Sequence, residues 1–308
     1  MFLPRLVLAA SVLPAAALLV GCGASAEDDG YDGRRAVAAF YPLAWVTARV
    51  AGDEWQVTNL TAPGAEPHDL SLDIAQTAEV SRADLVVVQD GFQPAIDETV
   101  ETNAGDAAVI DAAEVVDLMS ASEHDHEHEE SGHDHGDLDP HFWQDPLLMA
   151  DLADAVAEQL SEIDPGQASS YADRAADLRG ELESLDADYA AGLGSCARTT
   201  TVVSHEAFSY LARYGLAFEA IAGLSPDAEP TPADLARLQA LVTREGVTTV
   251  FSERLASSEM SDTLASDLGL ETAVLDPLEG LSDETADEDY LSLMRENLAA
   301  LRKANACS

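Results

Sequence analysis

The chain has 308 residues, 58 acidic against 15 basic side chains, and a formal net charge of −43 at pH 7. A hydrophobic content of 47% is enough for a core and excludes disorder of the whole chain. The acid excess excludes nucleic acid as a partner, because a phosphate backbone recruits Lys and Arg side chains. A chain of this length favours about two domains of roughly 100–200 residues each.

Residues 1–21 are predicted to be a signal peptide. Arg5 precedes an apolar run over residues 6–20, which is shorter than the about 20 residues that a membrane-spanning helix needs. The run ends in the sequence LVGC, which resembles a bacterial lipobox, so Cys22 is expected to be the lipidated first residue of the mature chain. Residues 22–34 then form a polar tether. The mature protein is expected outside the cell membrane, anchored to its outer face as a lipoprotein.

Short β-rich runs alternate with helical patterns along the rest of the chain, which predicts parallel sheets with crossover helices. The fold class is therefore α/β, with two lobes that each hold a mostly parallel four-stranded sheet and flanking helices. Strands are expected over residues 36–40, 56–60, 85–89, 107–110, 200–204, 217–220, 248–252 and 272–275. Helices are expected over residues 69–82, 92–102, 147–163, 167–193, 231–245, 257–268 and 288–303.

The helix expected over residues 167–193 could be about 40 Å long at 1.5 Å per residue, enough to run along both lobes as a rigid spine. The alternative is two ordinary surface helices with a kink between them. The predicted domains are an N-terminal lobe over residues 35–163, a linking helix over residues 164–194 and a C-terminal lobe over residues 195–308.

Two cysteines remain beyond Cys22, namely Cys196 and Cys307. In an oxidising compartment an even pair predicts a disulfide, which here would close a loop of about 110 residues. Two free buried thiols are the alternative. Neither cysteine has the spacing of a metal site.

Three of the eight histidines are dispersed along the chain, and two of these follow predicted strands. His68 lies in a Pro/Gly loop after the second strand, and His205 lies where the fifth strand ends. Asp276 follows the last strand, and His141 lies in the sequence DPHFWQDP. Because open α/β sheets hold ligands at the carboxyl ends of their strands, we expect one ion in the cleft between the lobes. The expected ligands are His68, His141, His205 and Asp276.

Three imidazoles and one carboxylate suit Zn²⁺ and its tetrahedral preference. Calcium and magnesium want mostly oxygen ligands, and Mn²⁺ would be favoured more by a set with two carboxylates. Glu66, close to His68 in the sequence, is a possible auxiliary ligand. Since imidazole must be neutral to coordinate, zinc affinity is expected to fall below about pH 6.

The other five histidines lie in one acidic segment over residues 123–136. We interpret this segment as a loose loop that collects or senses divalent cations. The alternative is an acidic low-complexity segment with no defined site. The possible auxiliary ligands here are His124, His126, His128, His133 and His135.

Several stretches, in this order, resemble signatures of the metal-specific solute-binding proteins of bacterial ABC importers: the opening AVAAFYPLAWVTARVAGDEWQVTNLTAPGAEPHDL, then DPHFWQDP, SHEAFSYLARYGL and VLDPLEGL. The resemblance covers about residues 36–303. It implies two α/β lobes bridged by one long helix, with a metal between them bound by His68, His141, His205 and Asp276. Histidine at the third position and a long His-rich loop are typical of the zinc type.

The resemblance implies a monomeric, high-affinity zinc receptor that delivers Zn²⁺ to the transmembrane subunit of an ABC permease. A manganese-type receptor of the same fold, a metal-dependent adhesin and a zinc buffer are the alternatives. An extracellular zinc hydrolase is a further hypothesis, but the sequence has no HExxH motif. The chain is therefore expected not to be an enzyme. It also lacks a phosphate-binding loop of the form GxxxxGK[ST], so ATP hydrolysis would belong to a separate protein.

Overall fold

The structure, a computed structural model, describes residues 33–120 and 138–308. The predicted signal peptide, Cys22 and the five clustered histidines lie outside the described residues. Of the helices in the described part, none has the length and apolar character that a membrane span requires.

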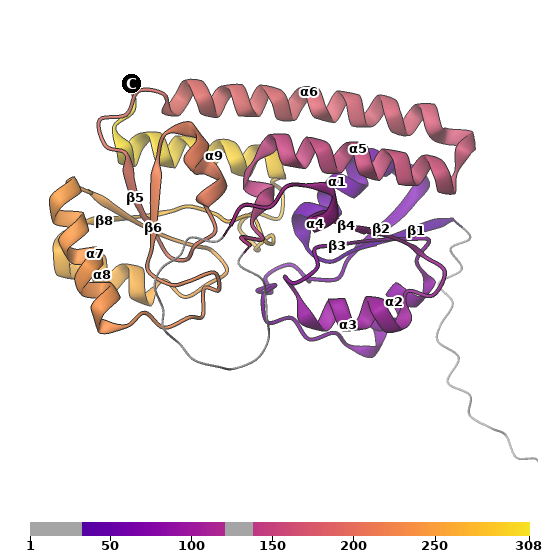
Figure 1. Cartoon of the computed structure of the whole chain (residues 1–308), viewed down its shortest axis with the longest axis horizontal. Coiled ribbons are helices and arrows are strands. Elements are labelled where there is room, and N and C mark those ends of the chain that lie inside the picture. The colour runs from indigo at the N-terminus through magenta and orange to yellow at the C-terminus, as the bar shows by residue number, and fades with distance from the viewer. Residues whose placement is uncertain (1–32, 121–137) are drawn as a thin grey trace, which may run out of the picture. The chain divides into compact units, whose positions relative to one another are not determined.

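Two four-stranded sheets, both parallel throughout, confirm the predicted fold class (Figure 1). The strand order is β2-β1-β3-β4 in the first sheet and β6-β5-β7-β8 in the second. The strands are β1 (Arg34–Ala38), β2 (Trp55–Asn59), β3 (Leu85–Val88), β4 (Ala108–Asp111), β5 (Thr200–Val203), β6 (Ala217–Ala220), β7 (Thr249–Ser252) and β8 (Glu271–Val274). Every predicted strand is present, shifted by at most two residues at an end. In each sheet the strand that starts the lobe lies second in the order, so the chain runs outward from it in both directions.

Helices connect the strands and cover the sheets. Figure 1 shows α5 and α6 on one side of the first sheet and α2 and α3 on the other. The α-helices are α1 (Tyr41–Ala51), α2 (Ile74–Arg82), α3 (Pro94–Asn103), α4 (Ala112–Val115), α5 (Pro146–Ile163), α6 (Ala168–Leu193), α7 (Pro232–Glu245), α8 (Glu259–Leu268) and α9 (Tyr290–Asn305). The short 3-10 helices are η1 (Gly52–Glu54), η2 (Phe142–Gln144), η3 (Pro165–Gln167) and η4 (Ser209–Tyr214).

Three helices differ from the prediction, and one of them is the four-residue α4, which is absent from the predicted set. Helix α2 begins at Ile74, five residues later than expected, because Asp73 and Gln76 form a reciprocal capping box that fixes its first turn. Helix α1 is also absent from the predicted set. Two residues separate it from β1 and it has no side-chain cap, so Pro42 in its first turn is the remaining signal of a helix start.

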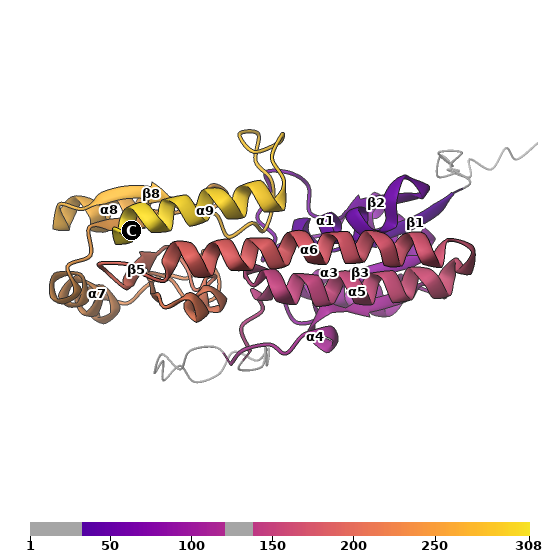
Figure 2. The same cartoon turned by 90° about the horizontal axis from the view of Figure 1, so that it is seen from above.

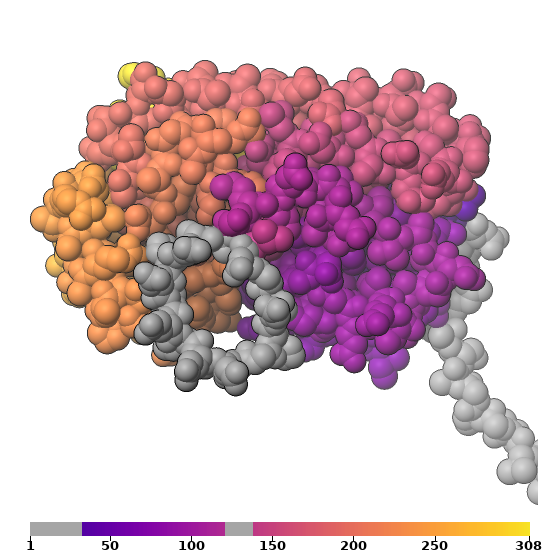
Figure 3. All heavy atoms as spheres, in the orientation of Figure 1, coloured from indigo at the N-terminus to yellow at the C-terminus, as the bar shows by residue number. Residues whose placement is uncertain are grey.

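Helix α6 has 26 residues, about 39 Å at 1.5 Å per residue, and packs against helices of both lobes. Figure 2 shows it alongside α5 over the first lobe and alongside α9 over the second. Arg174 of α6 donates to the carbonyl oxygens of Val50 and Ala51 at the end of α1, at 2.6 and 2.9 Å. At its other end the buried Tyr189 hydroxyl donates to the carbonyl oxygen of Met294 in α9, at 2.7 Å. The helix therefore joins the two lobes, and in Figure 3 their atoms abut beneath it.

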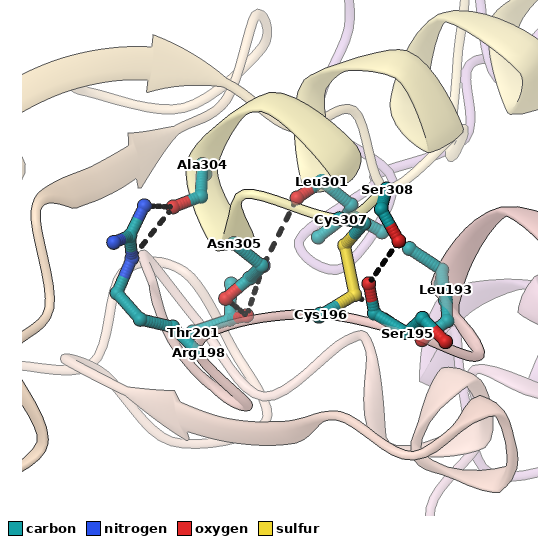
Figure 4. The surroundings of a disulfide bond; sticks show 10 residues. All are labelled: Leu193, Ser195, Cys196, Arg198, Thr201, Leu301, Ala304, Asn305, Cys307 and Ser308. Atoms are coloured by element: carbon teal, nitrogen blue, oxygen red, sulfur yellow. Dashed lines mark hydrogen bonds between the residues drawn. A yellow bond between two sulfur atoms is a disulfide. The ribbon is translucent and has the colours of Figure 1, made fainter.

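The predicted disulfide is present, joining Cys196 to Cys307 across 111 positions of sequence. Figure 4 shows it between the segment that follows α6 and the end of the chain. Close by, the Arg198 guanidinium donates twice to the carbonyl oxygen of Ala304, at 2.8 and 3.1 Å. The last turn of α9 is thus tied to the start of the second lobe by a covalent bond and a charged donor.

One carboxylate of the first lobe opposes folding at neutral pH. Burial, with the nearby carboxylates of Asp90 and Asp111, raises the pKa of Asp97 to about 6 from its ordinary 3.8. The group accepts the Gly91 N–H at 3.1 Å, but that single bond does not offset the loss of water. Because the folded-state pKa is the higher one, stability falls as the pH rises from about 4 to about 6.

Asp97→Asn should therefore stabilise the protein at neutral pH, since the amide oxygen can still accept from Gly91 and carries no charge. We expect a gain of about 1 kcal/mol in the free energy of unfolding, a value reduced for partial exposure of the group. Urea unfolding at about pH 7.5 and at about pH 4.5 measures it, and the gain at the lower pH should be only about a third of that at the higher one. An equal gain at both pH values would show that ionisation of Asp97 does not destabilise the folded protein.

Candidate metal centre

His68 lies in the loop between β2 and α2, where a carboxylate organises the backbone. Glu66 accepts the backbone N–H groups of His68 and Asp69, at 3.1 and 3.3 Å. Gln93 donates to the Pro67 carbonyl oxygen at 3.0 Å and so ties the same loop to the segment before α3. The His68 side chain is 11% exposed. Hydrogen bonds to the backbone of three successive residues, from Pro67 to Asp69, therefore fix the loop around His68.

His141 is fully buried immediately before η2. Its Nδ1 lies 2.7 Å from Oδ1 of Asp139, which also accepts the backbone N–H of His141 at 3.0 Å. A carboxylate on Nδ1 fixes the ring and favours the tautomer in which the other nitrogen, Nε2, is free to bind a metal. Asp139 is 1% exposed, so this pairing is shielded from water.

His205 follows β5 and is held in the same way. Its Nδ1 lies 2.6 Å from Oε1 of Glu253, a residue directly after β7 that also accepts from the Ser204 hydroxyl. His205 is fully buried, and Glu253 is 8% exposed. In both buried histidines a carboxylate therefore occupies Nδ1 and leaves Nε2 for a ligand.

Glu279, in the loop after β8, completes the group. Its Oε1 lies 3.4 Å from Nε2 of His68, 3.5 Å from that of His141 and 3.3 Å from that of His205. The four side chains can offer ligand atoms that all lie within 4.8 Å of one another. Two of the side chains come from each lobe, so a bound ion would bridge them.

The charges of the group are strongly coupled. Burial alone would raise the pKa of Glu279, but the three histidines hold it well below its usual value. Burial would lower the pKa of His205, yet Glu253 and Glu279 raise it to about 10. The pKa of His141 is raised as well, against burial, by Asp139 and Glu279. Without a metal, the site therefore balances buried carboxylates with protonated imidazoles.

The donor set fits a divalent transition metal. Among the described residues, Nε2 of His141 and Nε2 of His205 are buried and make no hydrogen bond of normal geometry. Three imidazole nitrogens and one carboxylate oxygen suit Zn²⁺, whereas Ca²⁺ and Mg²⁺ need more oxygen ligands. The geometry thus offers a buried four-ligand site.

The structure brings together the three histidines expected from the sequence, but it places Glu279 beside them rather than Asp276. The Asp276 carboxylate accepts from Arg254 at 2.7 Å and from the backbone N–H of Leu278 at 2.8 Å. The expectation from the sequence selects Asp276, the first acidic residue after the last strand. The same loop carries a second acidic residue, Glu279, three residues further on. Nothing in the local sequence VLDPLEG marks the second acid as the one that faces the histidines.

Glu66 lies at the edge of the group, with Oε1 3.9 Å from Nε2 of His68. Its carboxylate already accepts two backbone N–H groups, and burial raises its pKa. Its ligand atoms cluster instead with those of Asp69 and Asp227. An auxiliary role for Glu66 stays a prediction.

Comparison with protein families gives one match over nearly the whole described chain. Residues 36–304 match the family described as ZnuA, zinc-uptake complex component A, periplasmic. The zinc-binding lipoprotein AdcA of Streptococcus pneumoniae is 35% identical over 302 residues, covering 94% of this chain. This chain spans only 58% of the length of that relative. The high-affinity zinc uptake system protein ZnuA of Bacillus subtilis is 34% identical over 296 residues, which cover 92% of this chain and 93% of that protein.

Solved structures have the same fold. The Zn(II)-bound ZnuA-like domain of Streptococcus pneumoniae AdcA is 32% identical with a TM-score of 0.73, covering 89% of this chain and 99% of that one. The laminin-binding protein Lmb of Streptococcus agalactiae, described as an adhesin with metal-transporting activity, is 28% identical with a TM-score of 0.78. The alignment with Lmb covers 88% of this chain and 99% of that one. The extent of the family match and the identity to full-length relatives show that the chain belongs to the ZnuA family of zinc-uptake components.

Proposed function

We propose that the chain is the extracytoplasmic zinc receptor of an ABC importer, with His68, His141, His205 and Glu279 as the zinc ligands. The observation that carries the proposal is the buried group of three imidazoles and one carboxylate, with ligand atoms within 4.8 Å of one another. Family membership supports zinc as the cargo, since the relatives are zinc-uptake and zinc-binding proteins.

The location and partner follow from the same role. Cys22 would carry the lipid that holds the receptor at the outer face of the membrane. The receptor would act as a monomer and hand Zn²⁺ to the transmembrane subunit of a permease, with ATP hydrolysis in a separate protein. The similar AdcA of Streptococcus pneumoniae is named a lipoprotein, which supports the anchor.

Release of zinc would require the lobes to separate at the Glu279 loop. In the structure the carbonyl oxygen of Pro277 accepts from Nε1 of Trp143 at 2.8 Å and from Nε2 of Gln144 at 2.6 Å. The Gly64 N–H also donates to the Leu281 carbonyl oxygen at 2.7 Å. These contacts join the lobes at the site, and α6 joins them elsewhere. We therefore propose a small opening motion.

The site suits binding rather than catalysis. A catalytic zinc keeps one position open for water, whereas four protein ligands fill a tetrahedral site. We propose on this ground that the chain is not a zinc hydrolase. A manganese receptor would favour more oxygen ligands, which makes it the weaker alternative. An adhesin role is favoured only by the likeness to Lmb, and adhesion of the purified chain to immobilised laminin tests it.

Calorimetric titration of the metal-stripped chain with zinc tests the proposal. We expect one tight event per chain, a clear rise in melting temperature at stoichiometric zinc, and loss of that rise on adding a chelator. Competition with Mn²⁺ should leave zinc bound. No tight event, or preferential manganese binding, would contradict the zinc receptor.

A deletion of residues 123–136 separates the two kinds of site proposed for the chain. The tight event should persist in the deletion variant, and only weaker binding should disappear. Uptake of radioactive zinc by cells that lack the gene, complemented with either form, then distinguishes a receptor from a passive buffer. Equal uptake with and without the gene would favour the buffer.

A further inference from the structure

Asp276 lies three residues before Glu279, and hydrogen bonds occupy both of its carboxylate oxygens. Oδ1 accepts the backbone N–H of Leu278 at 2.8 Å, and Oδ2 accepts from Nη1 of Arg254 at 2.7 Å. Asn297 of α9 donates to the Asp276 carbonyl oxygen at 2.6 Å and accepts its N–H at 2.9 Å. Asp276 is 3% exposed. Hydrogen bonds therefore hold both the backbone and the side chain of Asp276, and its carboxylate is directed at the backbone N–H of Leu278.

Leu278, whose N–H the Asp276 carboxylate accepts, has an unusual backbone conformation. Leu278 is fully buried and has a φ of 60°, in the left-handed region that residues with a Cβ avoid. It immediately precedes Glu279, so its φ decides the direction in which the Glu279 side chain leaves the loop. Such a conformation persists only where neighbouring contacts impose it. The Asp276 carboxylate supplies one of these contacts directly.

We infer that Asp276, oriented by Arg254, is a positioning residue that holds Leu278 left-handed and thereby directs the Glu279 carboxylate at the three histidines. The inference rests on the proposed function, in which Glu279 binds the zinc. Without the bond to Oδ1, residue 278 can relax to a negative φ, which turns Glu279 away from the imidazoles. Asp276 would then govern zinc affinity without touching the ion.

The order of the second sheet explains why Arg254 is available. Strand β7 lies between β5 and β8, and it contributes no ligand to the group. The two residues that directly follow β7 each contact a residue that follows a neighbouring strand. Glu253 pairs with His205 after β5, and Arg254 donates to Asp276 after β8. One strand end thus orients both ligands of the second lobe.

Two substitutions of Asp276 separate positioning from direct binding. Asp276→Ala removes the acceptor for the Leu278 N–H, and we expect a loss of about 10–100-fold in zinc affinity, as for other partners of metal ligands. Asp276→Asn keeps an oxygen that can accept this N–H but places its amide NH2 against Arg254, so we expect a loss of zinc affinity smaller than that of Asp276→Ala. Equal, large losses in both variants would overturn the inference, because they would make the Asp276 carboxylate itself the ligand.

The same substitution in a Glu279→Gln background shows whether Asp276 acts through Glu279. We expect Asp276→Ala to cause no further loss there, because the group that it directs is already impaired. An undiminished loss in that background would overturn the inference. If Glu279→Gln alone leaves zinc affinity unchanged, the proposed ligand set fails instead. The two failures are therefore distinguishable.

Arg254→Met provides a second test if Asp276→Ala does not fold. It removes the donor to Oδ2 of Asp276, and the Arg254 side chain that it replaces is 22% exposed. It should lower zinc affinity, and less so in the Glu279→Gln background. Arg237→Met is the matched control, because it breaks an ion pair of 2.7 Å with Glu219 in the same lobe. Zinc affinity should be unchanged in that control. Cobalt absorption should change alike in Asp276→Ala and Glu279→Gln and change less in Asp276→Asn. A native spectrum in Asp276→Ala would overturn the inference.

Discussion

Replacing His205 with alanine should lower zinc affinity by more than about 100-fold, beyond the range found for partners that only orient a ligand. His205 is fully buried, and Glu253 on Nδ1 fixes its ring so that Nε2 lies 3.3 Å from Glu279. The fold should survive, because the sheets pack in apolar clusters that do not include His205, one that runs from β1 into the second lobe and one around β7. Calorimetry gives the affinity, and circular dichroism with the melting temperature of the metal-free chain controls for folding.

His205→Glu tests the chemistry of the same position. A second carboxylate gives two nitrogen and two oxygen ligands, which should shift the preference from zinc toward manganese. Competition between Zn²⁺ and Mn²⁺ on the native chain and on this variant, side by side, measures the shift. If the ratio of affinities is the same in both, His205 does not bind the metal.

The strand ends made much of the site predictable. A parallel sheet places the residues that follow its strands along one edge, so the sequence alone places His68 at that edge of the first sheet and His205 at that edge of the second. The predicted disulfide between Cys196 and Cys307 is confirmed. An even number of cysteines in an oxidising compartment is enough to predict it, since only two cysteines remain to pair. These predictions depend on local pattern and simple counting.

The fourth member of the group could not be found in this way. Asp276 and Glu279 share one loop, and their spacing alone does not say which of them faces the histidines. The difference lies in the left-handed Leu278 and in Arg254, which holds Asp276 from 22 positions away. Both are tertiary effects that leave no mark on the local sequence.

The carboxylates behind the histidines are equally hidden. Glu253 is 48 positions from His205 and meets it only because β5 and β7 are neighbours in the sheet. Asp139, two positions before His141, is closer, but a DxH spacing is too common to indicate a pair. Yet these two carboxylates change the expected pH range of binding, because they determine whether the imidazoles are charged in the metal-free protein.

Zinc affinity should rise steeply with pH from about 7 to about 9, a higher range than the reference pKa of imidazole suggests. The pKa of His205 is raised to about 10 and that of His141 is raised too, so at pH 7 the metal-free site holds protons. Zinc needs neutral imidazole, so binding must release these protons. Each proton released changes affinity about tenfold per pH unit.

The raised pKa of His205 also affects the stability of the metal-free chain, which falls rather than rises with pH. His205 has a folded-state pKa above its unfolded value, so its pairing with Glu253 and Glu279 stabilises the fold at low pH. That contribution is lost as the pH rises through about 10. Raising the pH therefore weakens the metal-free site while strengthening zinc binding, and zinc should stabilise the chain more at about pH 9 than at about pH 7.

Calorimetry at pH 7 in two buffers with different ionisation enthalpies counts the released protons. We expect one to two protons per zinc in the native chain. In Glu253→Gln, whose amide oxygen can still accept from His205 but carries no charge, the count should fall by about one, because the main cause of the raised pKa is gone. A heat of binding that is the same in both buffers would show that the imidazoles are neutral before zinc arrives.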